Sequence, residues 1–316
     1  MLKSVNTRFR AYQLGCAGAS YSYFAGNHFT LIEAMITERN KPQLLEELEI
    51  CGKKVIDTLH ITGWDSDHCS QSGLEWVLEH LKPRRIEYPG YDHGTACAIA
   101  CKKMILDYQA RPRPVAVKAQ RIDPPYIQGL SSVEGVGYTD IFYHPRELQE
   151  GSNDNSSVKF FRKGAFNVLS LGDVESSQIS SMIRRAANVK RETDILILAH
   201  HGADNGFTTK KFLEEVKPSI AICTSNYDNH HDHPRQEIRD LLWEQDIPLF
   251  TTKTGDIIIE STGSHKVDYL VTNLRANSTE VSSTKTFKAR KARLLSMNQD
   301  TLRALEHPGK RAPRRH

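Results

Sequence analysis

Three potential metal ligands fall within four residues of the sequence: Asp65, Asp67 and His68. Carboxylates and imidazoles together suit a hard or borderline divalent cation. A short apolar run ends just before them at Ile61, and Leu74 begins a series of apolar residues at helical spacing. We therefore expect the acidic cluster in a loop between a strand and a helix, where neighbouring side chains can converge. The alternative interpretation is a loop whose aspartate only caps the following helix.

Two later apolar runs also end in polar groups that can bind a metal. Asp173 follows the run that begins at Leu169, and His200 and His201 follow the run over residues 195–199. Three predicted strands therefore end in Asp-x-Asp-His, Gly-Asp and His-His-Gly, in that order along the chain. This recurrence favours a shared metal centre over an isolated capping aspartate.

Five motifs follow one another in an order that is similar to a known family. They are Thr62 to His68, Asn153 to Val158, Leu171 to Asp173, His200 to Ala203 and His231 to Pro234. In order and spacing, residues 8 to 261 resemble the metallo-β-lactamase fold, and specifically the soluble hydrolase domain of the ComEC family of DNA-uptake proteins. The resemblance implies an α/β protein with an αβ/βα metallo-β-lactamase-like sandwich.

The resemblance also implies a metal centre at the ends of these strands. Its candidate ligands are Asp65, Asp67, His68, Asp173, His200 and His201. One metal position is complete if it uses Asp67, His68, Asp173 and one histidine of the His200-His201 pair. The sequence does not decide between these two histidines. A Zn²⁺ or Mn²⁺ held there lowers the pKa of a bound water to about 7, which makes hydroxide available for hydrolysis. The expected catalytic residues are Asp67, His201 and His233, the last as a group that binds a phosphate or protonates a leaving oxygen.

The second metal position of such folds is incomplete in this chain. The family motif opens with a histidine where this sequence has Gly63, which offers no side-chain ligand. Asp65 and a bridging Asp173 would remain. We expect one tight metal and a second that is weak or absent, unless His93 supplies the missing nitrogen. The alternative for His93 is an ordinary polar residue at the surface or at the start of a helix.

The composition fits a globular protein without a membrane segment. The chain has 316 residues, of which 39% are hydrophobic, and this suffices for a buried core. It contains no run of about 18 apolar residues, so we expect no contact with a membrane. Its six cysteines form no metal-type Cys-x-x-Cys pairs, and we expect them to be reduced thiols in the cytoplasm. DNA import therefore does not follow from the resemblance.

The charge is distributed unevenly along the chain. From residue 275 to residue 316 there are eleven Lys or Arg and three acids, so this tail carries +8, whereas the net charge of the whole chain is +4. We expect a hydrolase domain over residues 1–274 and a basic, partly disordered tail over residues 275–316. Basic tails can hold a nucleic acid by neutralising its phosphates. A solvated tail without a ligand is the commoner alternative.

The remaining pattern predicts strands and helices around the metal loops. We expect hairpins over residues 157–169 and from Leu249 to Glu260, and helices over residues 96–108, 210–216 and 234–245. The favoured function is a nuclease or phosphodiesterase. The alternatives are a hydrolase of small esters, lactones or amides, and a non-catalytic metal-containing module that binds nucleic acid or a protein, because fold does not fix substrate.

Overall fold

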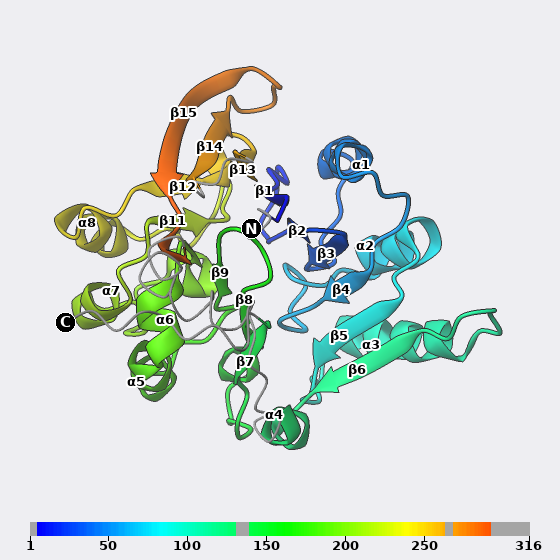
Figure 1. Cartoon of the computed structure of the whole chain (residues 1–316). Coiled ribbons are helices and arrows are strands. Elements are labelled where there is room, and N and C mark those ends of the chain that lie inside the picture. The colour runs from blue at the N-terminus through cyan, green and yellow to red at the C-terminus, as the bar shows by residue number, and fades with distance from the viewer. Residues whose placement is uncertain (1–4, 131–138, 263–267, 292–316) are drawn as a thin grey trace, which may run out of the picture.

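Two β-sheets face each other in the middle of the molecule, and helices cover the outer face of each (Figure 1). The structure is a computed structural model, and it describes residues 5–130, 139–262 and 268–291. Helices α1 (Asn40–Ile50), α2 (Gln71–Trp76) and α3 (Ala96–Ala110) pack on the first sheet. Helices α5 (Ser177–Arg185), α6 (Ala187–Glu192), α7 (Lys210–Val216) and α8 (Gln236–Glu244) pack on the second. The expected αβ/βα sandwich is confirmed.

The first sheet begins with β1 near its middle. Its strands are β1 (Thr7–Ala11), β2 (Tyr21–Ala25), β3 (His28–Ile32), β4 (Thr58–His60), β5 (Arg85–Pro89), β6 (Lys118–Ile122), β13 (Ile257–Ser261), β14 (Asp268–Leu274) and β15 (Val281–Lys288). They are ordered β15-β14-β13-β1-β2-β3-β4-β5-β6. Strands β3 to β6 are parallel, whereas the pairs from β15 to β3 are antiparallel. The parallel part carries the loop with the first candidate ligands.

The second sheet contributes the other candidate ligands. Its strands are β7 (Ile141–His144), β8 (Val158–Phe161), β9 (Val168–Ser170), β10 (Ile195–Ile197), β11 (Ile220–Cys223) and β12 (Leu249–Thr251), in the order β12-β11-β10-β9-β8-β7. Strands β9 to β12 are parallel, so their carboxyl ends lie along one edge. The hairpin expected over residues 157–169 is confirmed by the antiparallel pairing of β8 with β9.

Short helical segments complete the described chain. They are the π-helical turn η1 (Val77–Leu81) after α2, helix α4 (Pro124–Leu130), and the 3₁₀ turns η2 (Asn153–Asn155), η3 (Ala199–Gly202) and η4 (Thr252–Thr254). Helix α7 has the bounds that the sequence predicts, and α3 and α8 differ from the predicted ranges by two residues or fewer at each end.

Alternating side chains divide the apolar residues among three layers. In β10, Ile195 and Ile197 point into the core between the sheets, whereas Leu196 points outward under the helices. Val168 and Leu169 of β9 divide in the same way. This is the period of two that a strand buried on both faces requires.

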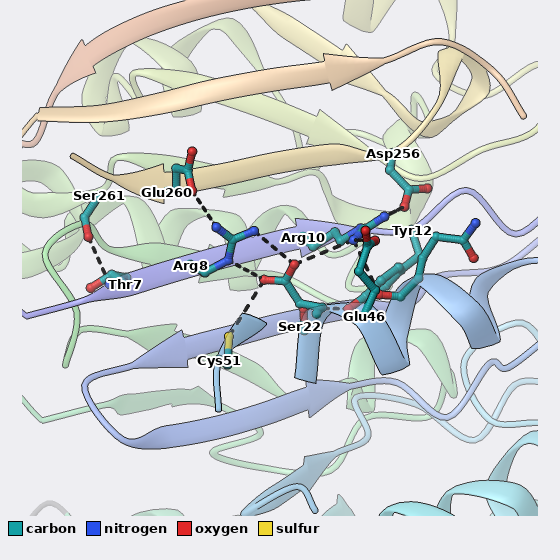
Figure 2. A network of polar contacts seen from close by, with 12 residues as sticks. Thr7, Arg8, Arg10, Tyr12, Ser22, Glu46, Cys51, Asp256, Glu260 and Ser261 are labelled. Carbon is teal, nitrogen blue, oxygen red and sulfur yellow. Dashed lines mark hydrogen bonds and ion pairs between the residues drawn. The ribbon is translucent and has the colours of Figure 1, made fainter. Parts of the chain in front are cut away.

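Charged side chains fasten α1 to the centre of the first sheet. Arg8 of β1 pairs with Glu47 of α1 at 2.7 Å. It also pairs with Glu260 of β13 (Figure 2). Arg10 joins Asp256 to the same helix, with its guanidinium 2.8 Å from the carboxylate (Figure 2). The two arginines are largely buried, so these ion pairs tie three segments that are far apart in sequence.

The hairpin expected from Leu249 to Glu260 is wrong. Strand β12 pairs in parallel with β11 in the second sheet, whereas β13 pairs with β1 and β14 in the first. The 3₁₀ turn η4 and Gly255 carry the chain from one sheet to the other. Two neighbouring strands of similar composition therefore belong to different layers.

The expected boundary between residues 274 and 275 is also wrong. Strand β15 lies within the supposed tail, yet it pairs with β14 along its whole length. Beyond it, the backbone N–H of Arg290 donates to Asp194 at 2.8 Å, and the buried Lys291 ammonium donates to the carbonyl of Gly164 at 2.9 Å. The folded part therefore continues to residue 291. Residues 292–316 of the predicted tail lie outside the described residues.

Asp194 and Lys291 belong to a buried charged cluster at the amino ends of β9 and β10. Its other charged members are Arg162 and Glu192, whose guanidinium and carboxylate form two parallel hydrogen bonds of 2.8 and 2.9 Å. We call these residues, with Arg290, the anchor cluster: Arg162, Glu192, Asp194, Arg290 and Lys291. It holds the end of the described chain against the second sheet.

Candidate metal centre

Four of the six candidate ligands converge at the carboxyl ends of β4, β9 and β10. Asp67, His68, Asp173 and His201 each offer one ligand atom, and these atoms all lie within 4.8 Å of one another. The Nε2 atom of His68 is 2.9 Å from Asp173, and the Nε2 atom of His201 is 3.5 Å from Asp67. We call these four residues the metal cluster. Asp65 and His200 lie outside it.

The loop after β4 is held in place by the glycine turn that follows β1. The backbone N–H of Ala19 donates to the carbonyl of Asp67 at 2.9 Å. Gly18 has a positive φ of 133°, and a Cβ atom there would stand 2.6 Å from the same carbonyl oxygen. Only glycine therefore allows the turn to approach the metal loop so closely. The glycines keep a structural role, and that role is to position Asp67.

Gly172 places Asp173 in the cluster for a similar reason. Its φ is 57°, and a Cβ atom would stand 2.8 Å from the Cβ of Ser156. The Gly-Asp motif thus needs glycine in order to turn the chain sharply at the exit of β9. Asp173 is 5% exposed and points into the space between the sheets at their common edge.

The histidine pair adopts a backbone conformation that side chains rarely allow. His200 and His201 have φ values of 43° and 51°, in the left-handed region. This turn directs His201 into the cluster, where its Nδ1 lies 2.9 Å from the carbonyl of Thr224 and 3.0 Å from its hydroxyl. Strained backbone of this kind concentrates at functional sites. The structure therefore brings His201, and not His200, next to the other three residues of the metal cluster.

Glu33 orients the other imidazole, and sequence reasoning missed it. The residue follows β3, is 1% exposed, and accepts hydrogen bonds from the backbone N–H and the hydroxyl of Thr62. Its Oε1 is 3.2 Å from Nδ1 of His68. A carboxylate on the outer nitrogen of a metal-binding histidine fixes the ring and its tautomer. The available signal was an acid at the end of an apolar run, the same pattern that identified Asp173.

These residues fit a divalent transition metal. The Nδ1 atoms of His68 and His201 face protein oxygens, whereas both Nε2 atoms are buried and make no hydrogen bond of acceptable geometry. Buried polar nitrogens without such a partner are costly unless a ligand completes them. Two carboxylates and two imidazoles form a donor set that suits Zn²⁺ or Mn²⁺.

The charges of the metal cluster reinforce one another. Burial disfavours the charged form of Asp173, but the imidazoles of His68 and His201 outweigh it and hold the pKa of this carboxyl at about 2. Burial opposes the charged form of His68 as well, and Asp173 and Glu33 nevertheless raise its pKa well above the ordinary value. The pKa of Asp67 is lowered against burial by His201 and His68. A metal binding here replaces protons on the imidazoles.

The second metal position is sparse. Gly63 provides no ligand, and a Cβ atom built on it would lie 3.9 Å from Oδ2 of Asp65, with no strained contact. Nε2 of His93 lies 3.5 Å from Oδ1 of the same aspartate. His93 is therefore next to the incomplete position, where it was predicted as a possible source of the missing nitrogen. These residues do not form a group of three close ligands within the described chain.

His200 and His233 lie beside the metal cluster. Nδ1 of His200 is 2.5 Å from the carboxylate of Glu175, and its ring centre is 5.7 Å from that of His233. Burial first, and then the charges of His200 and His201, lower the pKa of His233 to about 4. With this pKa the ring is mostly neutral near pH 7. The expected role of His233 as a proton donor stays a prediction.

The predicted basic tail contributes both exposed and buried charges. Lys285 and Lys288 are exposed on β15, whereas Arg290 and Lys291 belong to the anchor cluster. Apart from Arg275, the other basic residues of the predicted tail lie outside the described residues. In the described part of the chain, no helix combines the length and the apolar character that a membrane span requires. The cysteines are all free thiols.

Comparison with curated proteins agrees with the motifs. The chain is 25% identical over 220 residues to ComE operon protein 3 of Bacillus subtilis strain 168, and the match covers 68% of this chain and 26% of that protein. The chain resembles the ComEC family. It is also 27% identical over 112 residues to competence protein ComA of Neisseria gonorrhoeae, which covers 35% of this chain and 16% of that protein. The matched region is thus a minor part of each ComEC-like relative. No protein-family model matches the chain.

Solved structures with a similar arrangement share little sequence with the chain. The metallo-β-lactamase fold protein YhfI of Bacillus subtilis has 12% identity and a TM-score of 0.48, over 80% of this chain and 99% of that one. A metal-dependent hydrolase of the β-lactamase superfamily has 12% identity and a TM-score of 0.47, over 79% and 98% of the two chains. The strand order and the metal cluster of the ComEC-like chain itself carry the assignment of its fold.

Proposed function

We propose that the chain is a metal-dependent hydrolase that cleaves phosphodiester bonds. The observation that carries the proposal is the metal cluster: two carboxylates and two imidazoles meet at one sheet edge, and the imidazole Nε2 atoms point at the carboxylates without forming a hydrogen bond of good geometry. The resemblance to the ComEC hydrolase domain supports the phosphodiester class. The basic residues of the C-terminal region support a nucleic acid as substrate.

The residues of the chain divide the work of such a site. A divalent ion bound there supplies an activated water and polarises the oxygen of the substrate. Glu33 and Thr224 hold the rings of His68 and His201 so that Nε2 of each faces the ion position. The strained turn at His201 and the close packing at Gly172 keep these groups from shifting. Preorganisation of this kind lowers the cost of reaching the transition state.

Asp173→Ala tests the proposal, with Asp204→Ala as the matched control. Asp173 is buried in the metal cluster, whereas Asp204 is exposed on the loop that follows the turn η3. Elemental analysis should find about one tight Zn²⁺ or Mn²⁺ in the wild type and the control and almost none in Asp173→Ala. Hydrolysis of bis-p-nitrophenyl phosphate, single-stranded DNA or RNA should be lost with the metal.

One alternative function has an observation in its favour. Gly63 leaves the second metal position one ligand short, as a non-catalytic metal-containing module would allow. In that case the wild type binds metal and a nucleic acid or protein but hydrolyses none of the substrates above. Stoichiometric metal in Asp173→Ala would contradict both functions, because both use this cluster.

A further inference from the structure

A basic groove lies at the end of α3 that points away from the metal cluster. The amino end of α3 begins at Ala96, three residues after His93, whereas Tyr108 and Arg111 at its carboxyl end line the groove. The helix has 15 residues. Since an α-helix rises about 1.5 Å per residue, the groove and the incomplete metal position are separated by roughly 22 Å along the helix axis.

Four cations line this groove with a single carboxylate. They are Lys82, Arg84, Arg111 and Arg113, and the carboxylate is Glu79. Glu79 forms an ion pair with Arg111, in which the carboxylate and the guanidinium are 2.5 Å apart. Within the described part of the chain, no carboxylate lies within 4.0 Å of the charged groups of Lys82, Arg84 or Arg113. Three positive charges are thus left to attract an anion.

The groove also presents a fixed guanidinium and an apolar surface. Arg113 stacks on the ring of Tyr108, with its central carbon 3.7 Å from the ring centre. Tyr108 is buried, so this contact restrains the position of the guanidinium at the edge of the groove. Val115, beside it, is 67% exposed. Ordered cations next to apolar surface match the alternating phosphates and base faces of a single strand.

We propose that this groove binds the sugar–phosphate backbone of a single-stranded nucleic acid whose reacting bond lies at the metal cluster. The inference rests on the proposed phosphodiesterase function and adds a remote binding site to it. Guanidinium groups bind phosphate oxygens through paired N–H donors, and Lys82 and Arg84 add point charges. A strand must span the length of α3 in order to reach both sites. At about 3.4 Å per stacked nucleotide, the span requires roughly six or seven nucleotides.

The test compares two triple variants with equal changes in charge. The groove variant is Lys82→Gln, Arg84→Gln, Arg113→Gln. The control, Lys210→Gln, Lys211→Gln, Lys217→Gln, removes three exposed charges on and after α7, over the second sheet. Fluorescence anisotropy measures binding of labelled strands of 4 and 20 nucleotides, both DNA and RNA, to the metal-loaded full chain. Circular dichroism melting checks that both variants are folded.

The groove variant should bind the 20-nucleotide strand at least tenfold more weakly, whereas the control should bind it as the wild type does. The slope of log K against log salt should fall by about 2, because three phosphate contacts are lost at about 0.7 each. Binding of the 4-nucleotide strand, which is too short to reach both sites, should weaken much less than binding of the 20-nucleotide strand. Equal weakening by both variants, or equal weakening for both strand lengths, would overturn the groove assignment.

A small substrate separates this inference from the function beneath it. Bis-p-nitrophenyl phosphate is too short to reach the groove, so the groove variant should hydrolyse it at the wild-type rate. If the groove variant hydrolyses the small substrate and binds the 20-nucleotide strand as the wild type does, the remote site is wrong and the proposed phosphodiesterase function is supported. If strand binding depends on the groove but nothing is hydrolysed, the proposed function is wrong and the groove remains a nucleic-acid site.

Discussion

Strands β9 and β10 carry a buried polar cluster at each end, and the two clusters differ in how their charges are satisfied. In the anchor cluster at the amino ends, Asp194 accepts backbone N–H groups from Asn167 and Arg290, each at 2.8 Å, and Arg162 and Glu192 satisfy each other. In the metal cluster at the carboxyl ends, two buried imidazole nitrogens lie 2.9 and 3.5 Å from carboxylates but form no hydrogen bond of good geometry with them.

The difference separates a structural cluster from a ligand site. A cluster whose charges all have protein partners stabilises the fold and has no use for another molecule. A cluster whose outer atoms are held and whose inner atoms lack partners is prepared for a ligand. Both contain buried acids and bases, so burial and charge alone do not distinguish them. The direction of each polar atom does.

Truncation should have the largest effect, because it removes part of the anchor cluster. A chain that ends at residue 274 loses β15 and the contacts of Arg290 and Lys291, and leaves the carboxylate of Asp194 with one donor fewer. Buried groups that lose partners cost about 1–3 kcal/mol each, so we expect a loss on the order of 5 kcal/mol in the free energy of unfolding. Denaturant unfolding measures it.

The matched truncation ends at residue 291. It keeps β15 and the anchor cluster, so its unfolding midpoint should lie well above that of the chain that ends at residue 274. A chain ending at residue 274 that is equally stable would show that the anchor cluster contributes nothing. The same pair separates loss of basic charge from loss of fold in any assay of nucleic-acid binding.

Glu33→Gln should weaken the metal cluster without removing a ligand. The amide is the same size, but it cannot offer a carboxylate to Nδ1 of His68. Loss of such an outer partner typically costs 10- to 100-fold in metal affinity. Competition with a chromophoric chelator measures the Kd for Zn²⁺. Glu175→Gln, at a carboxylate that contacts His200 instead, is the control and should leave this Kd unchanged.

The pH dependence of stability should report the anchor cluster. Burial raises the pKa of Asp194 to about 7, despite the donors Arg290 and Asn167. The folded chain therefore holds a proton that the unfolded chain, with a pKa near 3.9, has released. The stabilisation from this proton is present at low pH and is lost as pH rises through about 7, by roughly 2 kcal/mol between pH 5 and pH 7.5.

Asp194→Asn should flatten that slope, since the amide does not titrate. Its absolute stability will be lower, because the amide nitrogen cannot accept a backbone hydrogen bond. The informative quantity is the difference in unfolding free energy between the two pH values in each protein. A variant with the same slope as the wild type would mean that Asp194 is charged throughout this range.

Gly63→His should produce the smallest change, and it extends the metal cluster instead of breaking it. The Cβ position is free of clashes, and it lies 3.9 Å from Oδ2 of Asp65. The added imidazole should tighten a second equivalent of Zn²⁺ by about tenfold, in line with the usual loss or gain of an oriented ligand partner. Calorimetric titration resolves the two equivalents. Gly63→Ala, which adds no donor, should bind as the wild type does.

The sequence identified the residues of the candidate metal cluster better than it identified the residues that hold them in place. Asp67, His68 and Asp173 were found because each follows an apolar run in a motif. His200 and His201 were not separable, since the left-handed turn that directs only His201 inward is a property of the folded backbone. Glu33 also follows an apolar run, as Asp173 does, but it was missed because it belongs to none of the five motifs.

The layered fold was predicted correctly, and two of its connections were not. The boundary at residue 275 failed because β15 is rich in Ser, Thr and Lys, which reads as a solvated segment, although its backbone pairs with β14. The hairpin from Leu249 to Glu260 failed because local composition does not record which sheet a strand joins. Pairing between distant strands decided both cases.

The central place of β1 has a consequence for how fast the chain can fold. One side of this strand pairs with β2, which follows it closely in the sequence. The other side pairs with β13, and the contact of Arg8 with Glu260 spans 252 residues. Closing a loop of that length costs roughly 5 kcal/mol of chain entropy, and this cost precedes any stabilisation from the contact. Folding should therefore be slow, and its rate should depend on when the last quarter of the chain becomes free to pair.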